Sequence, residues 1–169
     1  MIRLALVTEY YPLGSLLELS QNITLTLEQK KICSYQIAKG TEFLHDRNML
    51  LRTLGLKNVM VKKENDELHI VLTDFGLTQN RALSSANNYG LSKTILLKAP
   101  ETFKQDECSV ASDVWTFAVT ILQLYCGENL PSGNVEEIWA KGFPQHPDIE
   151  EREWIVLTLC WNHCPQIRY

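Results

Sequence analysis

The chain has 169 residues, of which 45% are hydrophobic and 21% charged, and its formal net charge is −4. This length and composition predict one ordinary globular domain, spanning residues 1–169, with a substantial core. Acidic and basic residues are interspersed, which argues against nucleic acid as a partner, and no apolar stretch is long enough for membrane insertion. Five cysteines without a paired pattern indicate a reducing, cytoplasmic compartment.

The first half of the chain predicts strands and helices in alternation. Residues 4–10 have the pattern of a buried strand, and residues 16–19 that of a short helix. Thr26 and Gln29 have the spacing of a capping box, so a long helix should run to about His45. The apolar face expected for this helix consists of Cys33, Ile37, Gly40 and Leu44. Short strands are expected at residues 49–51, 59–61 and 69–72, with a turn at 63–66.

The second half of the chain predicts helices alone. Residues 77–98 form a polar stretch rich in serine and asparagine, which is typical of a surface loop. Residues 111–125 are apolar on every side, so this helix should be buried at the centre of the domain. Two further helices are expected at residues 135–141 and 150–161. The sequence therefore predicts an α+β fold in which helices dominate.

One stretch carries a candidate site. The apolar residues 70–72 are followed by Asp74 and then by Gly76, so the aspartate should stand at the end of a buried strand. Such a position holds a metal or phosphate ligand rigidly, although an aspartate can also serve there as a simple turn former. Asn58 precedes the neighbouring apolar run of residues 59–61.

Four motifs in order give the chain a family resemblance. After Asn58 and the Asp-Phe-Gly of residues 74–76 come the Ala-Pro-Glu of residues 99–101 and the Ser-Asp-Val-Trp of residues 112–115. Their order and spacing resemble the large lobe of a eukaryotic protein kinase over essentially the whole chain. Cys160-Trp161 followed by a proline and an arginine is similar to the end of a tyrosine-kinase domain. Residues 74–78 and 109–115 look most like the Janus kinases.

The resemblance implies ATP and Mg²⁺ as cofactors and assigns roles to individual residues. Asn58 and Asp74 match the two metal ligands, which bridge phosphates and neutralise charge during phosphoryl transfer. Thr8 takes the gatekeeper position in the hinge between lobes. Backbone groups of Glu9 and Tyr11 would hydrogen-bond adenine, and the apolar floor beneath the base would be Met60.

Further positions match parts that support the kinase site. Asp113 matches the acid that braces the catalytic loop, and Glu101 should form an ion pair with Arg168. Tyr89 lies where tyrosine kinases carry a regulatory phosphotyrosine, and Arg52 is the usual partner of such a phosphate. An ordinary surface tyrosine is an equally good interpretation of Tyr89.

The chain departs from the family pattern at the catalytic base. Thr53 stands where the family has an aspartate, and a threonine hydroxyl does not act as a base near neutral pH. A general base is typically worth about 10² to 10⁴ in rate. Leu51 replaces the histidine of the same motif and could pack beneath Phe75.

The sequence also contains no Gly-rich loop and no strand lysine paired with a helix glutamate. We therefore expect the small lobe to be missing and the binding of ATP and Mg²⁺ to be weak or absent.

Three functions fit these observations. The first is a pseudokinase or truncated kinase that acts in signalling by binding other proteins, such as a partner kinase. The second is the large lobe of an active ATP-dependent tyrosine kinase whose small lobe is absent from this sequence. The third is a truncated product without function. The lost base at Thr53 favours the first and third, whereas the retained Asn58, Asp74 and Arg52 favour the first and second.

Overall fold

The computed structural model describes residues 7–73, 96–105, 108–127, 130–131 and 133–168. In these ranges the chain forms helices and one antiparallel sheet of two strands. The elements in chain order are α1 (Leu16–Asn22), α2 (Leu27–His45), η1 (Leu56–Asn58), β1 (Val59–Glu64), β2 (Glu67–Leu72), α4 (Thr102–Gln105), α5 (Val110–Cys126), α6 (Val135–Lys141), α7 (Glu151–Cys160) and η3 (Pro165–Ile167).

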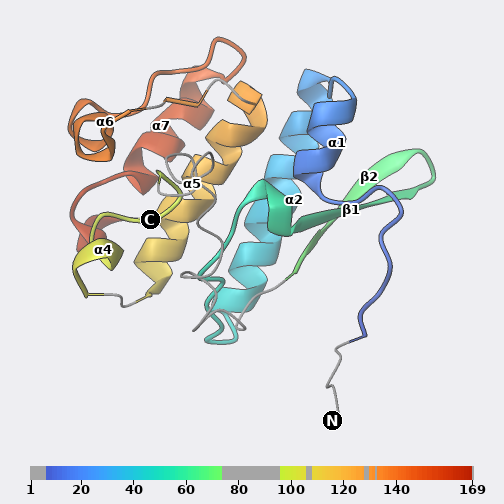
Figure 1. The fold of residues 1–169 in the computed structure, drawn as a ribbon, viewed down its shortest axis with the longest axis horizontal. Helices are drawn as coiled ribbons and strands as arrows, with labels where there is room; N and C mark the ends of the chain where they lie inside the picture. The colour runs from blue at the N-terminus through green and yellow to red at the C-terminus, as the bar shows by residue number, and fades with distance from the viewer. Residues whose placement is uncertain (1–6, 74–95, 106–107, 128–129, 132, 169) are drawn as a thin grey trace.

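Helix α5 lies between α2 and α7 and contacts both of them (Figure 1). Its N-terminus is closed by a capping box in which the side chains of Ser109 and Ser112 bind each other's backbone N–H groups. Two threonines inside the helix, Thr116 and Thr120, are buried, and Thr120 donates its hydroxyl proton to the carbonyl one turn earlier. The helix is therefore buried at the centre of the described fold, as its continuous apolar pattern predicts; its fully buried residues include Trp115, Ala118, Val119 and Leu122.

Helix α2 also forms as its sequence predicts. Thr26 is the N-cap, and its capping box with Gln29 is complete. Cys33, Ile37 and Leu44 are buried, and burial raises the pKa of the Cys33 thiol to about 11. The fourth residue of the predicted face, Gly40, allows close packing, because a Cβ there would come within 2.8 Å of a methyl carbon of Leu72 on β2.

The two strands pair from Val59 opposite Leu72 to Glu64 opposite Glu67. Only Asn65 and Asp66 remain for the turn, and both have positive φ, at 50° and 68°. Asparagine and aspartate tolerate this conformation, which the tightest hairpin turns require. Strand β1 therefore extends further than predicted, and the turn is shorter.

A side chain of α2 completes the hydrogen bonding of β2. The Gln36 amide nitrogen donates to the carbonyl of Leu68 at 2.8 Å, and its amide oxygen accepts from the N–H of Ile70 at 2.7 Å. These two bonds imitate the backbone of a neighbouring strand. The glutamine thereby satisfies strand groups that would otherwise need water or a third strand.

Two predicted strands are wrong in the described residues. Residues 7–10 form no strand, and Val7 and Tyr10 are 90% and 83% exposed. Residues 49–51 form none either, although Leu51 is buried, because its N–H binds a side chain rather than a neighbouring strand. An apolar run indicates burial, but a strand also needs a partner in register.

Helices α1, α6 and α7 form where the sequence predicts helices. Helix α1 runs to Asn22, beyond its predicted end, and starts at a Ser15–Glu18 capping box. The bounds of α6 are those predicted, and those of α7 agree within one residue at each end. Most of the predicted loop at residues 77–98, with Tyr89, lies outside the described residues. Within the part of the chain that is described, no helix combines the length and apolar character needed to cross a membrane.

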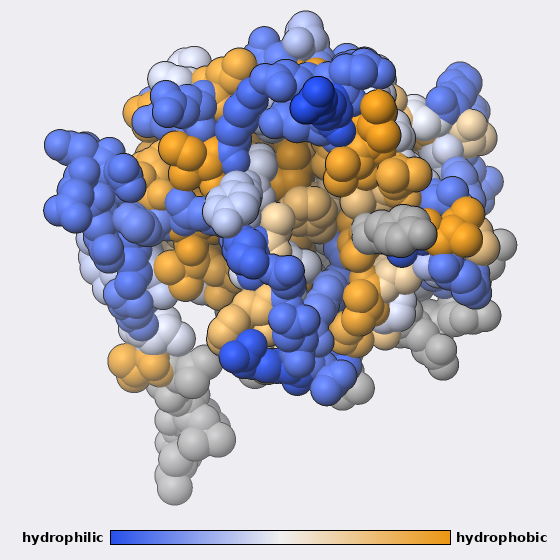
Figure 2. Space-filling view, turned by 180° about the vertical axis from the view of Figure 1, so that it is seen from behind, coloured by the Kyte–Doolittle hydropathy of each residue, from blue (hydrophilic) through white to orange (hydrophobic). Residues whose placement is uncertain are grey.

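Several large apolar side chains remain exposed at the surface of α2 and α7. The space-filling view from behind shows apolar side chains scattered among polar ones on that face (Figure 2). Single exposed apolar residues are normal on protein surfaces. The exposed members of these two helices include Leu27, Ile32, Tyr35, Phe43, Ile155, Val156 and Leu159.

Candidate functional site

The candidate site is built on the carboxylate of Asp113, which projects from the first turn of α5 and is 1% exposed. One carboxylate oxygen accepts the N–H of Leu51 at 2.7 Å, and the other accepts the N–H of Arg52 at 2.8 Å. The ring nitrogen Nε2 of His45 lies 3.1 Å from the first oxygen. A buried carboxylate is tolerated when hydrogen bonds replace its water, and such charge-assisted bonds are strong. Asp113 thus fixes the start of the loop at residues 51–58.

This loop contains a strained residue at its beginning. Arg52 has a φ of +62°, a left-handed conformation that costs a non-glycine residue about 1 kcal/mol. The following N–H, of Thr53, bonds to the carbonyl of Leu51 at 2.7 Å and closes a tight turn. The hydrogen bond from Arg52 to Asp113 holds the strained backbone in place. The side chain of Arg52 is exposed to solvent.

Asn58 closes the loop at its other end. Its amide nitrogen donates to the carbonyl of Thr53 at 2.6 Å. Its own carbonyl accepts both the N–H and the hydroxyl of Thr73, each at 3.0 Å. Asn58 therefore joins Thr53 to the residue that directly precedes Asp74. The amide nitrogen of Asn58 is bound to the carbonyl of Thr53, so the amide oxygen is the side-chain atom that can bind a metal. An oxygen is the ligand atom that magnesium prefers.

The second predicted metal ligand, Asp74, lies outside the described residues, and so does Phe75. Within the described ranges, no group of three or more histidine, cysteine or acidic side chains is placed to hold a metal. The family's site does not need such a group, because one asparagine and one aspartate with the phosphates supply its ligands. The assignment of Asn58 and Asp74 as metal ligands stays a prediction.

The predicted adenine-binding residues come from two segments that lie together. Met60 is half-buried on β1, on the strand face opposite to Val59, and forms an isolated bridge with Ser15. The preceding hinge segment holds Thr8 and Glu9, which are exposed, and the half-buried Tyr11. Their roles toward nucleotide stay predictions.

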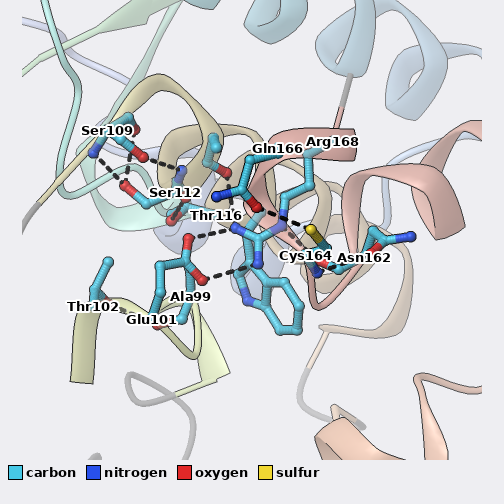
Figure 3. Close-up of polar contacts among 12 residues, drawn as sticks. Ala99, Glu101, Thr102, Ser109, Ser112, Thr116, Asn162, Cys164, Gln166 and Arg168 are labelled. Atoms are coloured by element: carbon cyan, nitrogen blue, oxygen red, sulfur yellow. Dashed lines mark hydrogen bonds and ion pairs between the residues drawn. The ribbon is translucent and has the colours of Figure 1, made fainter. Parts of the chain in front are cut away.

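The predicted ion pair between Glu101 and Arg168 forms, although the residues lie 67 positions apart (Figure 3). The two guanidinium nitrogens donate to the two carboxylate oxygens at 2.5 and 2.9 Å, so the pair is bidentate. Arg168 also donates to the carbonyls of Asn162 and Ala111, and its guanidinium lies 5.0 Å from the Trp115 ring centroid. The Arg168 side chain is fully buried, and that of Glu101 is 24% exposed.

Helix α5 also holds the chain just before Ala99. The indole N–H of Trp115 donates to the carbonyl of Leu96 at 3.3 Å, and the Thr116 hydroxyl donates to the carbonyl of Leu97 at 2.8 Å. Both ends of the candidate site therefore rest on one buried helix.

Sequence reasoning missed two residues of this region. His45, the last residue of α2, reaches Asp113, and Lys62 on β1 reaches Glu9. No local pattern signals either contact, because the partners lie far apart in the sequence. Only the long-range assembly brings them together.

A mainly helical fold, with a short antiparallel sheet beside a loop held by a buried aspartate, is the architecture of the large lobe of a protein kinase. The family model for protein tyrosine and serine/threonine kinases matches residues 2–169, and the chain belongs to this family.

Within this family, the similar proteins include several tyrosine kinases. It is 30% identical over 170 residues to the epidermal growth factor receptor of Apis mellifera, covering 94% of this chain and 13% of that protein. It is 28% identical over 177 residues to the human tyrosine-protein kinase FRK, covering 96% and 34%. It is also 28% identical over 167 residues to the receptor tyrosine-protein kinase erbB-2 of Mesocricetus auratus, covering 92% and 13%. The chain thus spans about a third or less of these relatives, and the predicted tyrosine-kinase type is confirmed.

The first prediction concerns the carboxylate of Asp113. In Asp113→Asn only one oxygen remains, so the N–H of Leu51 or Arg52 loses its acceptor inside the protein. We expect the free energy of unfolding, measured by urea denaturation, to fall by about 3 kcal/mol. The matched control is Asp66→Asn, at an exposed turn position, which should change stability by less than about 0.5 kcal/mol. Equal effects of the two variants would show that Asp113 does not brace the loop.

The second prediction concerns the fork of Arg168. Arg168→Lys keeps the charge but loses the bidentate geometry and the bond to Asn162. We expect the free energy of unfolding, measured by urea denaturation, to fall by about 2 kcal/mol. This is less than the roughly 3 to 5 kcal/mol lost when one partner of a buried pair is removed. Arg152→Lys, an exposed change on α7, is the control and should be nearly neutral. A double-mutant cycle with Glu101→Gln should give a clear coupling energy. Additive effects would contradict a cooperative pair.

Proposed function

We propose that this chain is a pseudokinase domain of tyrosine-kinase type that acts in signalling by binding another protein, such as a partner kinase. The observation that carries the proposal is the residue at position 53. The backbone of the catalytic loop is held at both ends, by Asp113 and by Asn58, while the side chain that would take the proton is a threonine. The arrangement keeps the shape of the loop and lacks its base.

The chemistry of phosphoryl transfer supports this reading. A base within reach of the substrate hydroxyl accepts its proton as the bond to phosphorus forms. The Thr53 hydroxyl lacks the basicity for this role. Loss of the base alone removes about 3 to 5 kcal/mol of barrier lowering. A domain that keeps its fold under these conditions is suited to binding rather than to catalysis.

One alternative has its own support. The oxygen of Asn58 fits a magnesium ligand, and Asp74 stands at the matching sequence position, as in an active tyrosine kinase whose ATP clamp lies outside these residues. ATP and Mg²⁺ are then the cofactors implied by family membership. Asn58 and Asp74 would hold the metal. Backbone groups of Glu9 and Tyr11 would bind the adenine, above the apolar floor of Met60. Magnesium would neutralise phosphate charge there.

Three finer assignments belong to the same proposal. The likeness to the Janus kinases rests on residues 74–78 and 109–115. A cytoplasmic location is supported by five cysteines without a pairing pattern. The whole of residues 1–169 is taken as one domain fragment, consistent with the continuous core around α5.

The third prediction tests catalysis. The chain with ATP and Mg²⁺ should transfer no phosphate to a tyrosine peptide above a blank, because Thr53 cannot take the hydroxyl proton. The control is Asp74→Asn, which should leave this background unchanged. Turnover by the wild-type chain that disappears in Asp74→Asn would reject the pseudokinase proposal and favour the active kinase. Binding is tested separately, by whether stoichiometric amounts of the chain alter the turnover of an added active tyrosine kinase.

The fourth prediction concerns nucleotide. The 169 residues contain no Gly-rich loop and no lysine clamp for the phosphates, so few contacts hold the charged end of ATP. We expect a dissociation constant above about 100 μM, which corresponds to a binding free energy weaker than about −5.5 kcal/mol. A thermal-shift titration of the chain with ATP and Mg²⁺ measures it. A low-micromolar constant would contradict the expectation and show that other groups complete the site.

A further inference from the structure

The hinge segment at residues 7–13 is not held by apolar burial at its start. Val7 and Tyr10 are 90% and 83% exposed, and residues 7–11 belong to no helix or strand. A polar cluster occupies the same segment. The carboxylate of Glu9 lies 2.5 Å from the ammonium of Lys62, and its other oxygen accepts the hydroxyl of Tyr11 at 3.2 Å. The Lys62 ammonium also lies 5.5 Å from the centroid of the Tyr11 ring.

The segment is attached to β1 at a second point, nearer α1. Ser15 forms a bridge with Met60, and the N–H of Val61 donates to the carbonyl of Gly14 at 3.0 Å. Gly14 turns the chain there, with a φ of +69° and an N–H bonded to the carbonyl of Tyr11 at 2.9 Å. The backbone contacts at Ser15 and Gly14 therefore fix one end of the segment.

Lys62 supplies the contact at the other end. On a strand, alternate side chains share a face, so Lys62 lies on the same face of β1 as Met60. From that face its ammonium reaches Glu9 and the ring of Tyr11, the two residues whose backbone groups are assigned to adenine. Strand β1 therefore carries Met60, the proposed floor of the adenine site, and through Lys62 it also holds the segment whose backbone would bind the adenine edge.

The charges of the pair support each other. Hydrogen bonding to Lys62 lowers the pKa of Glu9, and hydrogen bonding to Glu9 raises the pKa of Lys62. Because the carboxyl pKa is lowered in the folded state, the contact is present above the ordinary carboxyl pKa and is lost as the pH falls through the lowered value. Glu9 is largely exposed, so the pair contributes little to global stability and acts on local position.

We propose that Lys62 is a positioning residue, which holds Glu9 and Tyr11 against β1 and so sets the backbone edge that would face adenine. This inference rests on the proposed function, which assigns adenine to that edge. Lys62 contacts the segment through the side chains of Glu9 and Tyr11. Its effect on a bound nucleotide would therefore be indirect.

Lys63→Met provides a matched control for Lys62→Met. Lys63 is the next residue of β1, points to the opposite face, and forms its own ion pair with Asp66 at 2.8 Å inside the hairpin turn. Both variants remove one lysine charge and one ion pair from the same strand. Only Lys62→Met removes a contact to the hinge segment.

The experiment measures amide hydrogen exchange of the full chain at pH 7, corrected for intrinsic rates. In Lys62→Met, the N–H of Gly14, which donates to the carbonyl of Tyr11 at 2.9 Å, should exchange about three- to fivefold faster than in the wild type, the effect expected of one exposed ion pair. Lys63→Met should leave this rate unchanged, and Lys62→Arg should keep the wild-type rate. The global midpoint of urea unfolding should be nearly the same in all variants. Equal exchange in the two methionine variants would overturn the proposal.

A charge exchange gives the decisive rescue. Lys62→Glu should speed exchange of the Gly14 N–H further than Lys62→Met, because two carboxylates then repel, and the double variant with Glu9→Lys should restore the wild-type rate. Failure of this rescue would overturn the proposal.

Adenosine, titrated while amide NMR shifts are followed, reports on the adenine edge. The affinity of the chain for adenosine should fall in Lys62→Met by the factor by which amide exchange rises in that variant. It should stay unchanged in Lys63→Met. If adenosine shifts no amide of residues 8–13 in the wild type, the adenine assignment is wrong, and the exchange rates still decide whether Lys62 holds the segment.

Discussion

The structure depends on the hydrogen bonds that the buried carboxylate of Asp113 accepts. This carboxylate is almost completely buried, and a buried charge is stable only if hydrogen bonds replace its water. Two backbone N–H groups of one loop and the ring of His45 supply them. The end of α2, the start of α5 and the loop between α2 and β1 must therefore assemble together. The left-handed backbone of Arg52 persists because this assembly holds it.

Helix α5 extends the same principle to the other side of the site. Its second residue, Ala111, accepts a bond from Arg168, while Trp115 and Thr116 hold the carbonyls of Leu96 and Leu97. Most side chains of this helix are buried, and displacement of the helix would open cavities around them. Segments that are distant in the sequence thus take their positions from a single rigid element.

This construction separates the shape of the catalytic loop from its chemistry. The bonds from Asp113 and from the Asn58 amide that hold the loop end on backbone atoms of Leu51, Arg52 and Thr53. In the proposed function, Thr53 deprives this loop of its base while the loop keeps its shape, and the domain works by binding another protein.

The sequence by itself determined five helices, α1, α2, α5, α6 and α7, the hairpin, and the ion pair of Glu101 with Arg168. Capping boxes and apolar periodicity are local signals, and α2, α5, α6 and α7 follow them closely. Family spacing was enough to predict the pair and the brace at Asp113. The tertiary structure decided the rest. Residues 49–51 are buried without becoming a strand, and Gln36 and Lys62 acquire partners far along the chain, because hydrogen-bond partners are set by which segments the core brings side by side.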